Sequence, residues 1–151
     1  MTKKRGFEIV KKFKDAGLDL PQRETANAAG YDIKAAADIT IPADGSIKLV
    51  STGLKAYMQA DEVLYLINRS SGPYKRGLVL PNSVGVIDAD YYNNEKNEGE
   101  IFVQMRSIFG QDVQIKKGDR IVQAIFIPFL IADDDQATGV RAGGFGSTGD
   151  K

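Results

Sequence analysis

Apolar residues in this chain gather in short runs between turn signals, and they do not recur at helical spacing. Runs rich in Val, Ile, Leu, Phe and Tyr predict strands at residues 7–10, 31–36, 47–50, 54–58, 63–67, 101–105, 113–115 and 121–129. Turns containing Gly and Asp separate several of these runs, at 43–46, 109–112 and 117–119. No amphipathic stretch is long enough for a packed helix, which leaves at most one helical turn at 71–76. Short strands with frequent turns are typical of sandwiches, barrels and jelly rolls, so we expect an all-β fold.

The last predicted strand, at 121–129, is unusually apolar for a small sheet. We expect both of its faces to be covered, one of them by a neighbouring subunit. The acidic run at 132–135 is interpreted as a solvated linker rather than a metal site, because adjacent carboxylates in an extended chain point apart. The predicted organisation is therefore a β core over residues 1–131, followed by a linker and a glycine-rich C-terminal arm over residues 132–151.

Composition narrows the possible partners. The chain has 151 residues, enough for one domain, and its 20 basic residues balance its 20 acidic ones. A neutral chain lacks the positive field that non-specific binding to nucleic acid or to an anionic membrane requires. No run approaches the roughly 18 apolar residues of a membrane span and no signal-peptide pattern opens the sequence, so we expect a cytoplasmic protein.

The residue types that the chain lacks exclude several chemistries. It contains no Cys and no His, which rules out disulfides, thiol nucleophiles, histidine bases and Ser-His-Asp triads. We therefore expect any hydrolytic base to be Asp or Glu. A magnesium ion held mainly by substrate phosphates stays compatible, because Mg²⁺ commonly takes few protein ligands.

The C-terminal arm combines a cation, hydroxyls, four glycines and one aromatic ring between Arg141 and Gly149. Glycines let backbone N–H groups turn toward an anion, Arg141 can donate two hydrogen bonds to a phosphate, and Phe145 offers a face to a base. The letters G-x-G-x-x-G within the arm do not indicate a dinucleotide-binding turn, which needs a strand before it and a helix after it. Composition alone leaves two interpretations open, a flexible tail and a lid that orders on a phosphate ligand.

Four further polar segments accompany the predicted strands. They are Ala29-Gly-Tyr-Asp-Ile33, Arg69-Ser-Ser-Gly72, Gly85-Val-Ile-Asp-Ala-Asp-Tyr91 and Gly118-Asp-Arg-Ile-Val-Gln-Ala124. Each alone is compatible with an ordinary turn or hairpin. In this order, and followed by the arm, they closely resemble the five motifs of the homotrimeric dUTP pyrophosphatases (dUTPases), over residues 25–149. The resemblance implies a jelly-roll-like β-barrel that assembles as a homotrimer, in which each active site is built from all three chains and the arm closes a neighbouring site.

The resemblance also implies the reaction and its residues. Water attacks the α-phosphorus of dUTP and releases dUMP and pyrophosphate, which limits uracil incorporation into DNA and supplies dUMP for thymidylate synthesis. Asp88 would position or deprotonate that water, since an Asp is ionised at neutral pH. Mg²⁺ would bridge the phosphates without a direct protein ligand, and Asp32 would reach it through water. The implied substrate-binding residues are Arg69, Ser70, Ser71, Asn82, Val86, Tyr91, Gln123, Arg141, Phe145, Gly146, Ser147 and Thr148.

Within that set, hydrogen bonding explains the choice of base. Asn82 and backbone groups over residues 78–86 can satisfy the uracil edge, whereas cytosine would leave groups unpaired. Tyr91 corresponds to a family ring that packs under the deoxyribose, where a ribose 2′-OH would collide. Phe145 would stack on the uracil ring.

Two departures from the family pattern leave questions open. Residues 93–98 intervene between the motif Tyr91 and Gly99, so we expect a longer polar loop beside the site, of unknown role. The Arg-Ser-Ser sequence at 69–71 also resembles the related dCTP deaminases, but Gln104 stands where those enzymes carry a catalytic Glu. A dCTP deaminase-like enzyme and a non-catalytic nucleotide-binding jelly-roll regulator remain the alternatives, the second disfavoured by the presence of Asp88.

Overall fold

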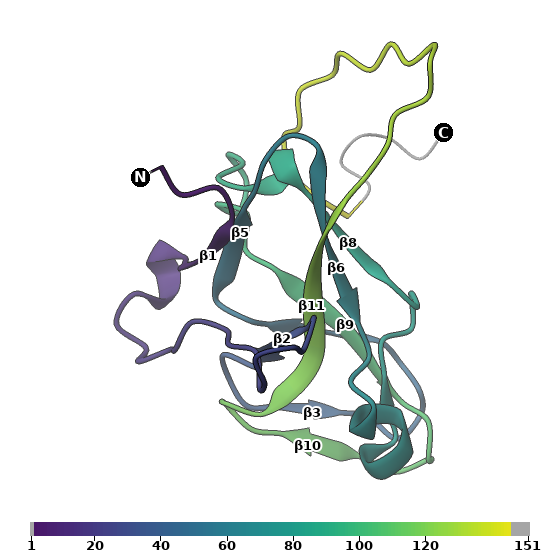
Figure 1. The fold of residues 1–151 in the computed structure, drawn as a ribbon. Coiled ribbons are helices and arrows are strands. Elements are labelled where there is room, and N and C mark those ends of the chain that lie inside the picture. The colour runs from purple at the N-terminus through teal and green to yellow at the C-terminus, as the bar shows by residue number, and fades with distance from the viewer. Residues whose placement is uncertain (1, 146–151) are drawn as a thin grey trace.

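The fold is built almost entirely from short antiparallel strands, and a computed structural model describes residues 2–145 of it (Figure 1). The strands are β1 (Gly6–Ile9), β2 (Tyr31–Lys34), β3 (Ile39–Ile41), β4 (Lys48–Ser51), β5 (Leu54–Tyr57), β6 (Glu62–Ile67), β7 (Leu78–Val79), β8 (Gly85–Asp88), β9 (Phe102–Ser107), β10 (Val113–Ile115) and β11 (Arg120–Pro128). The helical turns are η1 (Lys11–Phe13), η2 (Gly72–Arg76) and η3 (Ala89–Tyr91). The prediction of an all-β fold is therefore confirmed.

A four-stranded sheet in the order β2-β11-β6-β8 carries most of the segments with candidate chemistry. The long strand β11 lies between β2 and β6, and it can be followed along the middle of Figure 1. A three-stranded sheet, β4-β9-β7, and the pairs β1-β5 and β3-β10 complete the framework. Every pairing between described strands is antiparallel, and each joins strands that are not consecutive along the chain.

The core follows from the alternation of side chains along these strands. In β9, Val103, Met105 and Ser107 are buried, while Phe102, Gln104 and Arg106 face the opposite side. In β11, Val122 and Ala124 are fully buried and pack with Leu64 and Leu66 of β6. One face of the four-stranded sheet therefore packs against the core, and its other face points outward.

The predicted strands are confirmed to within two residues at their ends. The helical turn expected at 71–76 is the π-helical turn η2, which has Pro73 in its first turn and ends at Gly77, whose φ of 64° suits glycine. The strands β3, β7 and β8 lie outside the predicted runs. β7 has only two residues, Thr40 interrupts the apolar residues of β3, and β8 has only two apolar residues between Gly85 and Asp88. Within residues 2–145, no helix has the length and hydropathy needed to cross a membrane.

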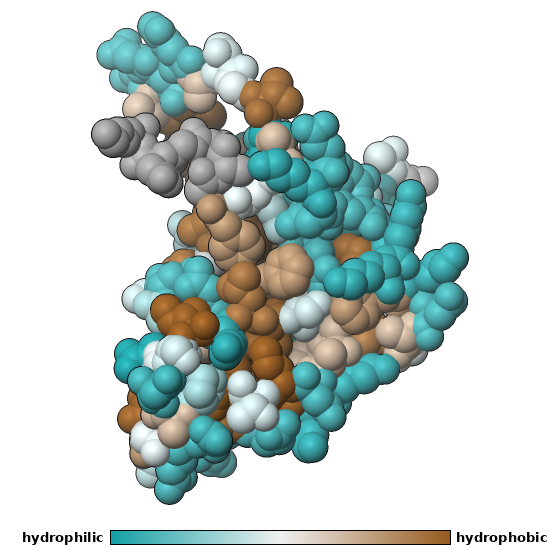
Figure 2. Space-filling view, turned by 180° about the vertical axis from the view of Figure 1, so that it is seen from behind, coloured by the Kyte–Doolittle hydropathy of each residue, from teal (hydrophilic) through white to brown (hydrophobic). Residues whose placement is uncertain are grey.

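Apolar side chains also reach the surface. Figure 2 shows a hydrophobic band between hydrophilic regions on the rear of the molecule. Several large apolar side chains are substantially exposed on the single chain, including Ile47, Leu49, Val84, Val86, Phe129 and Leu130. A hydrophobic band on the surface of a soluble protein marks a place of association.

Candidate active site

Asp88 ends strand β8, at the point where the chain turns into η3. Its backbone remains extended, with φ of −77° and ψ of 155°, and its side chain is 48% exposed. Strand β8 lies tightly against β6, since a Cβ at Gly85 would come within 3.0 Å of Leu66. The motif glycine therefore permits the close pairing that fixes the position of Asp88.

Beside Asp88 lies a cavity of about 180 Å³. Its walls come from the 82–88 segment, from Tyr91, and from Phe102 and Gln104 on the outer side of β9. The arm residues Arg141, Gly144 and Phe145 cover it. The cavity thus joins most of the residues that the resemblance implies for the base and the sugar.

The arm is held over this cavity by charge. Arg141 donates hydrogen bonds to Asp88 Oδ2 at 2.5 Å and to Asp90 Oδ1 at 2.7 Å, and its side chain is 19% exposed. The Phe145 ring lies edge-on to Phe102, with ring centroids 6.4 Å apart. In the single chain, this part of the arm therefore lies on the chain's own Asp88.

Tyr91 forms the buried floor of the site and is 6% exposed. Its Oη donates to the Glu100 carbonyl at 2.6 Å and accepts a hydrogen bond from Asn97 Nδ2 at 2.8 Å. Burial raises the pKa of the Tyr91 phenol above its usual range, while the bond from Asn97 acts in the opposite direction. Tyr91 therefore stays a neutral ring at physiological pH.

A second polar cluster lies around Asp32 in β2. Arg69 Nε donates to Asp32 Oδ1 at 3.2 Å, and Arg120 lies 3.5 Å from Asp32 Oδ2. Gln123 is paired with Asp32 across the β2-β11 ladder. A Cβ at Gly30 would overlap the Gln123 side chain, which explains physically why the first motif carries a glycine there.

The turn after β6 brings hydroxyls to this second cluster. Asn68 accepts a hydrogen bond from Leu80 N through its side chain, and its carbonyl accepts one from Gln123 Nε2 at 3.1 Å. Arg69 also contacts Ser71 Oγ at 3.3 Å, while Ser70 is exposed. The cluster thus presents a cation, hydroxyls and an amide, which are donors suited to phosphate oxygens.

The two clusters share the outer face of the four-stranded sheet but lie far apart on it. Asp88 pairs with Val63 of β6, whereas Gln123 pairs with Ile67, four residues further along the same strand. At about 3.3 Å per residue this is roughly 13 Å along the strand, and two strand spacings add about 10 Å across it. A single phosphorus atom therefore cannot contact both clusters of one chain.

Most implied site residues fall into one of these clusters. Asn82, Val86, Asp88, Tyr91, Arg141 and Phe145 line the cavity, whereas Asp32, Arg69, Ser71 and Gln123 form the second cluster. Gly146, Ser147 and Thr148 lie outside the described residues. Sequence reasoning missed Phe102 and Asp90, and it assigned no role in the cavity to Gln104. Only the alternation along β9 would have indicated that Phe102 and Gln104 share a face.

No group of three or more acidic side chains that could hold a metal ion occurs within residues 2–145. Asp32 is already engaged by Arg69 and Arg120. A carboxylate paired in this way suits an outer role, in which it accepts hydrogen bonds from metal-bound water. The donor set therefore fits a Mg²⁺ ion whose ligands come mainly from phosphate oxygens and water.

Comparison with known proteins identifies relatives over nearly the whole chain. The dUTPase family model matches residues 15–149. A curated relative from Lactococcus lactis subsp. lactis (strain IL1403), named deoxyuridine 5'-triphosphate nucleotidohydrolase, is 60% identical over 147 residues, covering 96% of this chain and 97% of the relative. A protein of the same name from Desulfitobacterium hafniense (strain DSM 10664 / DCB-2) is 39% identical over 143 residues, covering 90% and 91%.

Solved structures of dUTPases are also similar to this chain. The crystal structure of dUTPase from Streptococcus mutans matches with a TM-score of 0.80 and 58% identity, covering 85% of this chain and 98% of that one. A mutant dUTPase from phage phi11 of Staphylococcus aureus, described with a structural Mg(II) ion, matches with a TM-score of 0.71 over 91% and 98% of the chains. Its identity is only 18%, so this second likeness concerns the fold.

Proposed function

This chain belongs to the dUTPase family, and from that premise we propose that Asp88 is the residue that activates water in its site. The enzyme is a nucleotide hydrolase that converts dUTP to dUMP. The position of Asp88 carries the proposal, because its half-exposed carboxylate borders a cavity of about 180 Å³ beside Tyr91. The arm brings a cation to the same carboxylate.

Asp88 acts on a water molecule in line with the α-phosphorus. A carboxylate is a weak base at neutral pH, so positioning of the water and neutralisation of the phosphates carry much of the barrier. The water attacks phosphorus, its proton passes to the Asp88 carboxylate, and the bond to the bridging oxygen breaks to release pyrophosphate. When dUTP binds, its phosphates compete with Asp88 and Asp90 for the Arg141 guanidinium, which frees Asp88 for the water.

The second cluster supplies the phosphate contacts. Arg69, Ser70, Ser71 and Gln123 offer donors to the α- and β-phosphates, and Arg141 with Gly146, Ser147 and Thr148 closes on the γ-phosphate. Mg²⁺ is the proposed cofactor, which neutralises charge on the triphosphate when bound, and Asp32 would hold its water ligands. Preorganised cations stabilise the charge that develops on a leaving pyrophosphate.

The cavity selects the nucleoside. Asn82 is exposed at the rim of the cavity, and the backbone from Asn82 to Val86 offers donors and acceptors to the uracil edge. Phe145 stacks on the base, a contact of about 1–3 kcal/mol. Tyr91 lies beneath the deoxyribose and leaves no room for a 2′-OH.

Several observations support a homotrimer with shared sites. Asp88 and Gln123 face outward on the same sheet, too far apart to serve one phosphorus atom. Between them the outer face carries Tyr65, Val86 and Ile125, which are half-buried or exposed in the single chain. A second copy laid on this apolar face covers it and can bring its own Asp88 toward this chain's Gln123.

The arm is proposed to close a neighbouring site. Every residue from 128 to 140 is exposed, and this stretch arches away from the sheets in Figure 1. Such a linker leaves the arm free to dock on its own Asp88 or on that of an adjacent chain. The division into a core over 1–131 and an arm over 132–151, like the cytoplasmic location, stays a prediction.

A turnover assay tests the function directly. Purified protein with Mg²⁺ is expected to release pyrophosphate from dUTP and to act weakly on dCTP, dTTP and UTP. Ammonia released from dCTP would indicate the deaminase alternative, and binding of dUTP without turnover would indicate a regulator. Neither alternative gains support from the relatives, which are nucleotidohydrolases.

A further inference from the structure

The loop between Tyr91 and β9, at residues 93–98, is closed on itself. Asn93 N donates to the Glu98 carbonyl at 3.0 Å, and Glu98 N donates to the Asn94 carbonyl at 3.0 Å. Asn93 and Glu98 both have left-handed backbones, with φ of 57° and 63°. A glutamate adopts this conformation only where its surroundings impose it. The loop is therefore held in one shape by specific contacts.

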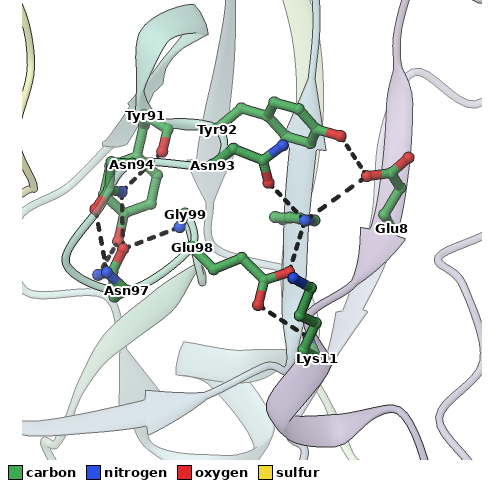
Figure 3. Close-up of polar contacts among 10 residues, drawn as sticks. Glu8, Lys11, Tyr91, Tyr92, Asn93, Asn94, Asn97, Glu98 and Gly99 are labelled. Carbon is green, nitrogen blue, oxygen red and sulfur yellow. Dashed lines mark hydrogen bonds and ion pairs between the residues drawn. The ribbon is translucent and has the colours of Figure 1, made fainter.

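A buried lysine from β5 fixes the outer side of the loop. Lys55 is 8% exposed and donates to Asn93 Oδ1 at 2.5 Å and to Glu98 Oε2 at 2.6 Å. Its ammonium also lies 5.1 Å from the centroid of the Tyr92 ring. Glu98 in turn accepts a hydrogen bond from Lys11 N, which ties the loop to η1 (Figure 3). A buried cation with these partners anchors the loop to the body of the fold.

The inner side of the loop faces Tyr91 through Asn97. The Asn97 Oδ1 atom accepts hydrogen bonds from Asn94 Nδ2 at 2.8 Å and from Gly99 N at 3.0 Å. Gly99 N can only donate, so the oxygen of the Asn97 amide must point toward it. The Nδ2 end is thereby turned to the Tyr91 hydroxyl, as Figure 3 shows.

The Tyr91 hydroxyl is consequently fixed from two sides. Its proton is committed to the Glu100 carbonyl, and its oxygen accepts from Asn97. The ring between this anchor and the backbone borders the cavity, and the arm residue Gly144 lies directly against it. A ring held at both ends cannot move away to admit a larger ligand.

We infer that Asn97 is a positioning residue, which sets the Tyr91 ring and so sharpens the selection of 2′-deoxyribose against ribose. The inference rests on the proposed function, in which Tyr91 lies beneath the sugar. Steric exclusion of the ribose 2′-OH requires that the Tyr91 ring stays in place, because a ring that shifts by about 1 Å begins to admit a hydroxyl. The loop at 93–98 then holds the Tyr91 ring in place through Asn97.

Asn97→Ala tests this role, because it removes the amide that donates to Tyr91 Oη. The ratio of kcat/KM for dUTP to that for UTP is expected to fall about tenfold, mainly through faster turnover of UTP. In Asn97→Asp the carboxylate keeps the acceptors for Asn94 and Gly99 and can accept the Tyr91 hydroxyl proton, so a smaller fall in the ratio is expected.

Asn93→Gly is the matched control in the same loop. Glycine accepts the positive φ of this position, and the change removes a contact of Lys55 without touching Tyr91. We expect a lower melting temperature with an unchanged dUTP/UTP ratio. An equal fall in the ratio for Asn93→Gly would tie selectivity to loop stability in general and overturn the specific role of Asn97.

A double-mutant cycle separates positioning from simple destabilisation. If Asn97 acts through the hydroxyl, then Asn97→Ala adds little to the loss of selectivity in Tyr91→Phe, which lacks that hydroxyl. Additive effects on the ratio, or an unchanged ratio in Asn97→Ala, would refute the inference. Neither result touches the proposed function, which fails only if the unmodified enzyme does not prefer dUTP to UTP.

Discussion

At the residue scale, two nearby carboxylates contact the same arginine but differ in their access to the cavity. Asp88 and Asp90 both meet Arg141, but only Asp88 borders the cavity beside Tyr91. Either acid can thus pair with Arg141, whereas only Asp88 is placed for the contact with water that we propose. The same substitution, Asp to Asn, is therefore expected to have different effects on turnover at the two positions.

Asp88→Asn is expected to bind dUTP and to hydrolyse it about 10²- to 10⁴-fold more slowly, because an amide cannot accept the proton of water. Removal of the negative charge should leave binding of the triphosphate intact or tighter. Single-turnover kinetics with Mg²⁺-dUTP measure the hydrolysis, and calorimetry measures the binding. Asp90→Asn, which weakens the other charged contact of Arg141, should reduce turnover far less. Equal losses in the two variants would remove Asp88 from the proposed role.

Acid stability should reflect the ion pair of Glu62. Arg5 donates to Glu62 Oε2 at 2.5 Å, and this bond, ahead of one from Gln59 N, lowers the pKa of Glu62 below its ordinary value of 4.5. The folded protein holds the ionised form more tightly than the unfolded chain does, so the stabilisation is present above pH 4.5 and is lost as the pH falls through the lowered pKa.

Arg5→Met should therefore lower the melting temperature at pH 7, and its difference from the unmodified protein should narrow as Glu62 is protonated. Thermal unfolding from pH 7 down to pH 3 measures this. Lys3→Met removes a nearby exposed cation and serves as the control for net charge. A difference that stays constant with pH would contradict the role of the pair.

At the scale of elements, the sequence predicts strands well where a run of apolar residues coincides with a strand. It fails for β3, where the polar Thr40 separates two isoleucines and the pairing partner is β10, more than 70 residues away. The candidate site shows the same contrast between local sequence patterns and long-range contacts. The five motifs point to Asp88 through a family resemblance, but the bond from Asn97 to Tyr91 lies in a loop with left-handed backbone at Asn93 and Glu98, which no local pattern reveals.

The arm should be sensitive to side chains only where it meets a rigid surface. A Cβ at Gly144 would lie 2.8 Å from Tyr91 Cε1, in a ring that Asn97 holds in place. A Cβ at Gly143 meets only the Lys96 side chain, with Cδ nearest at 2.8 Å, and this side chain is flexible and can move. Gly139 has open space around it.

Gly144→Ala is therefore expected to reduce kcat/KM for dUTP by about tenfold, or about 1.4 kcal/mol of transition-state stabilisation. Gly143→Ala should cost less, and Gly139→Ala should behave as the unmodified enzyme does. Steady-state kinetics at constant Mg²⁺ give the three values. An order in which Gly139→Ala is as harmful as Gly144→Ala would show that backbone freedom, rather than the fit against Tyr91, limits the arm.

At the scale of the whole molecule, the arm should be separable from the fold. Every residue from 128 to 140 is exposed, and the core cluster draws on residues up to Phe126. A chain ending at Val140 should keep its melting temperature within a few degrees and its oligomeric state, yet lose most of its hydrolysis of dUTP. Light scattering, thermal unfolding and pyrophosphate release measure these properties. Full activity in the shortened chain would show that the arm plays no part in closing the site.

The distance between the two clusters leads to a sharper test of assembly. Asp88→Asn and Arg69→Ala should each be nearly inactive alone, because one lacks the residue that we propose activates water and the other lacks a proposed phosphate contact. If each site takes Asp88 from one chain and Arg69 from another, trimers assembled from an equal mixture contain intact sites. Half of the chains supply a native Asp88 and half supply a native Arg69, so about a quarter of the sites should be active.

Refolding the two variants together and then assaying dUTP hydrolysis measures this recovery, with separately refolded variants mixed afterwards as the control. A mixture no more active than its components would mean that each chain completes its own site, and the roughly 13 Å along β6 would then have to be bridged by movement within one chain.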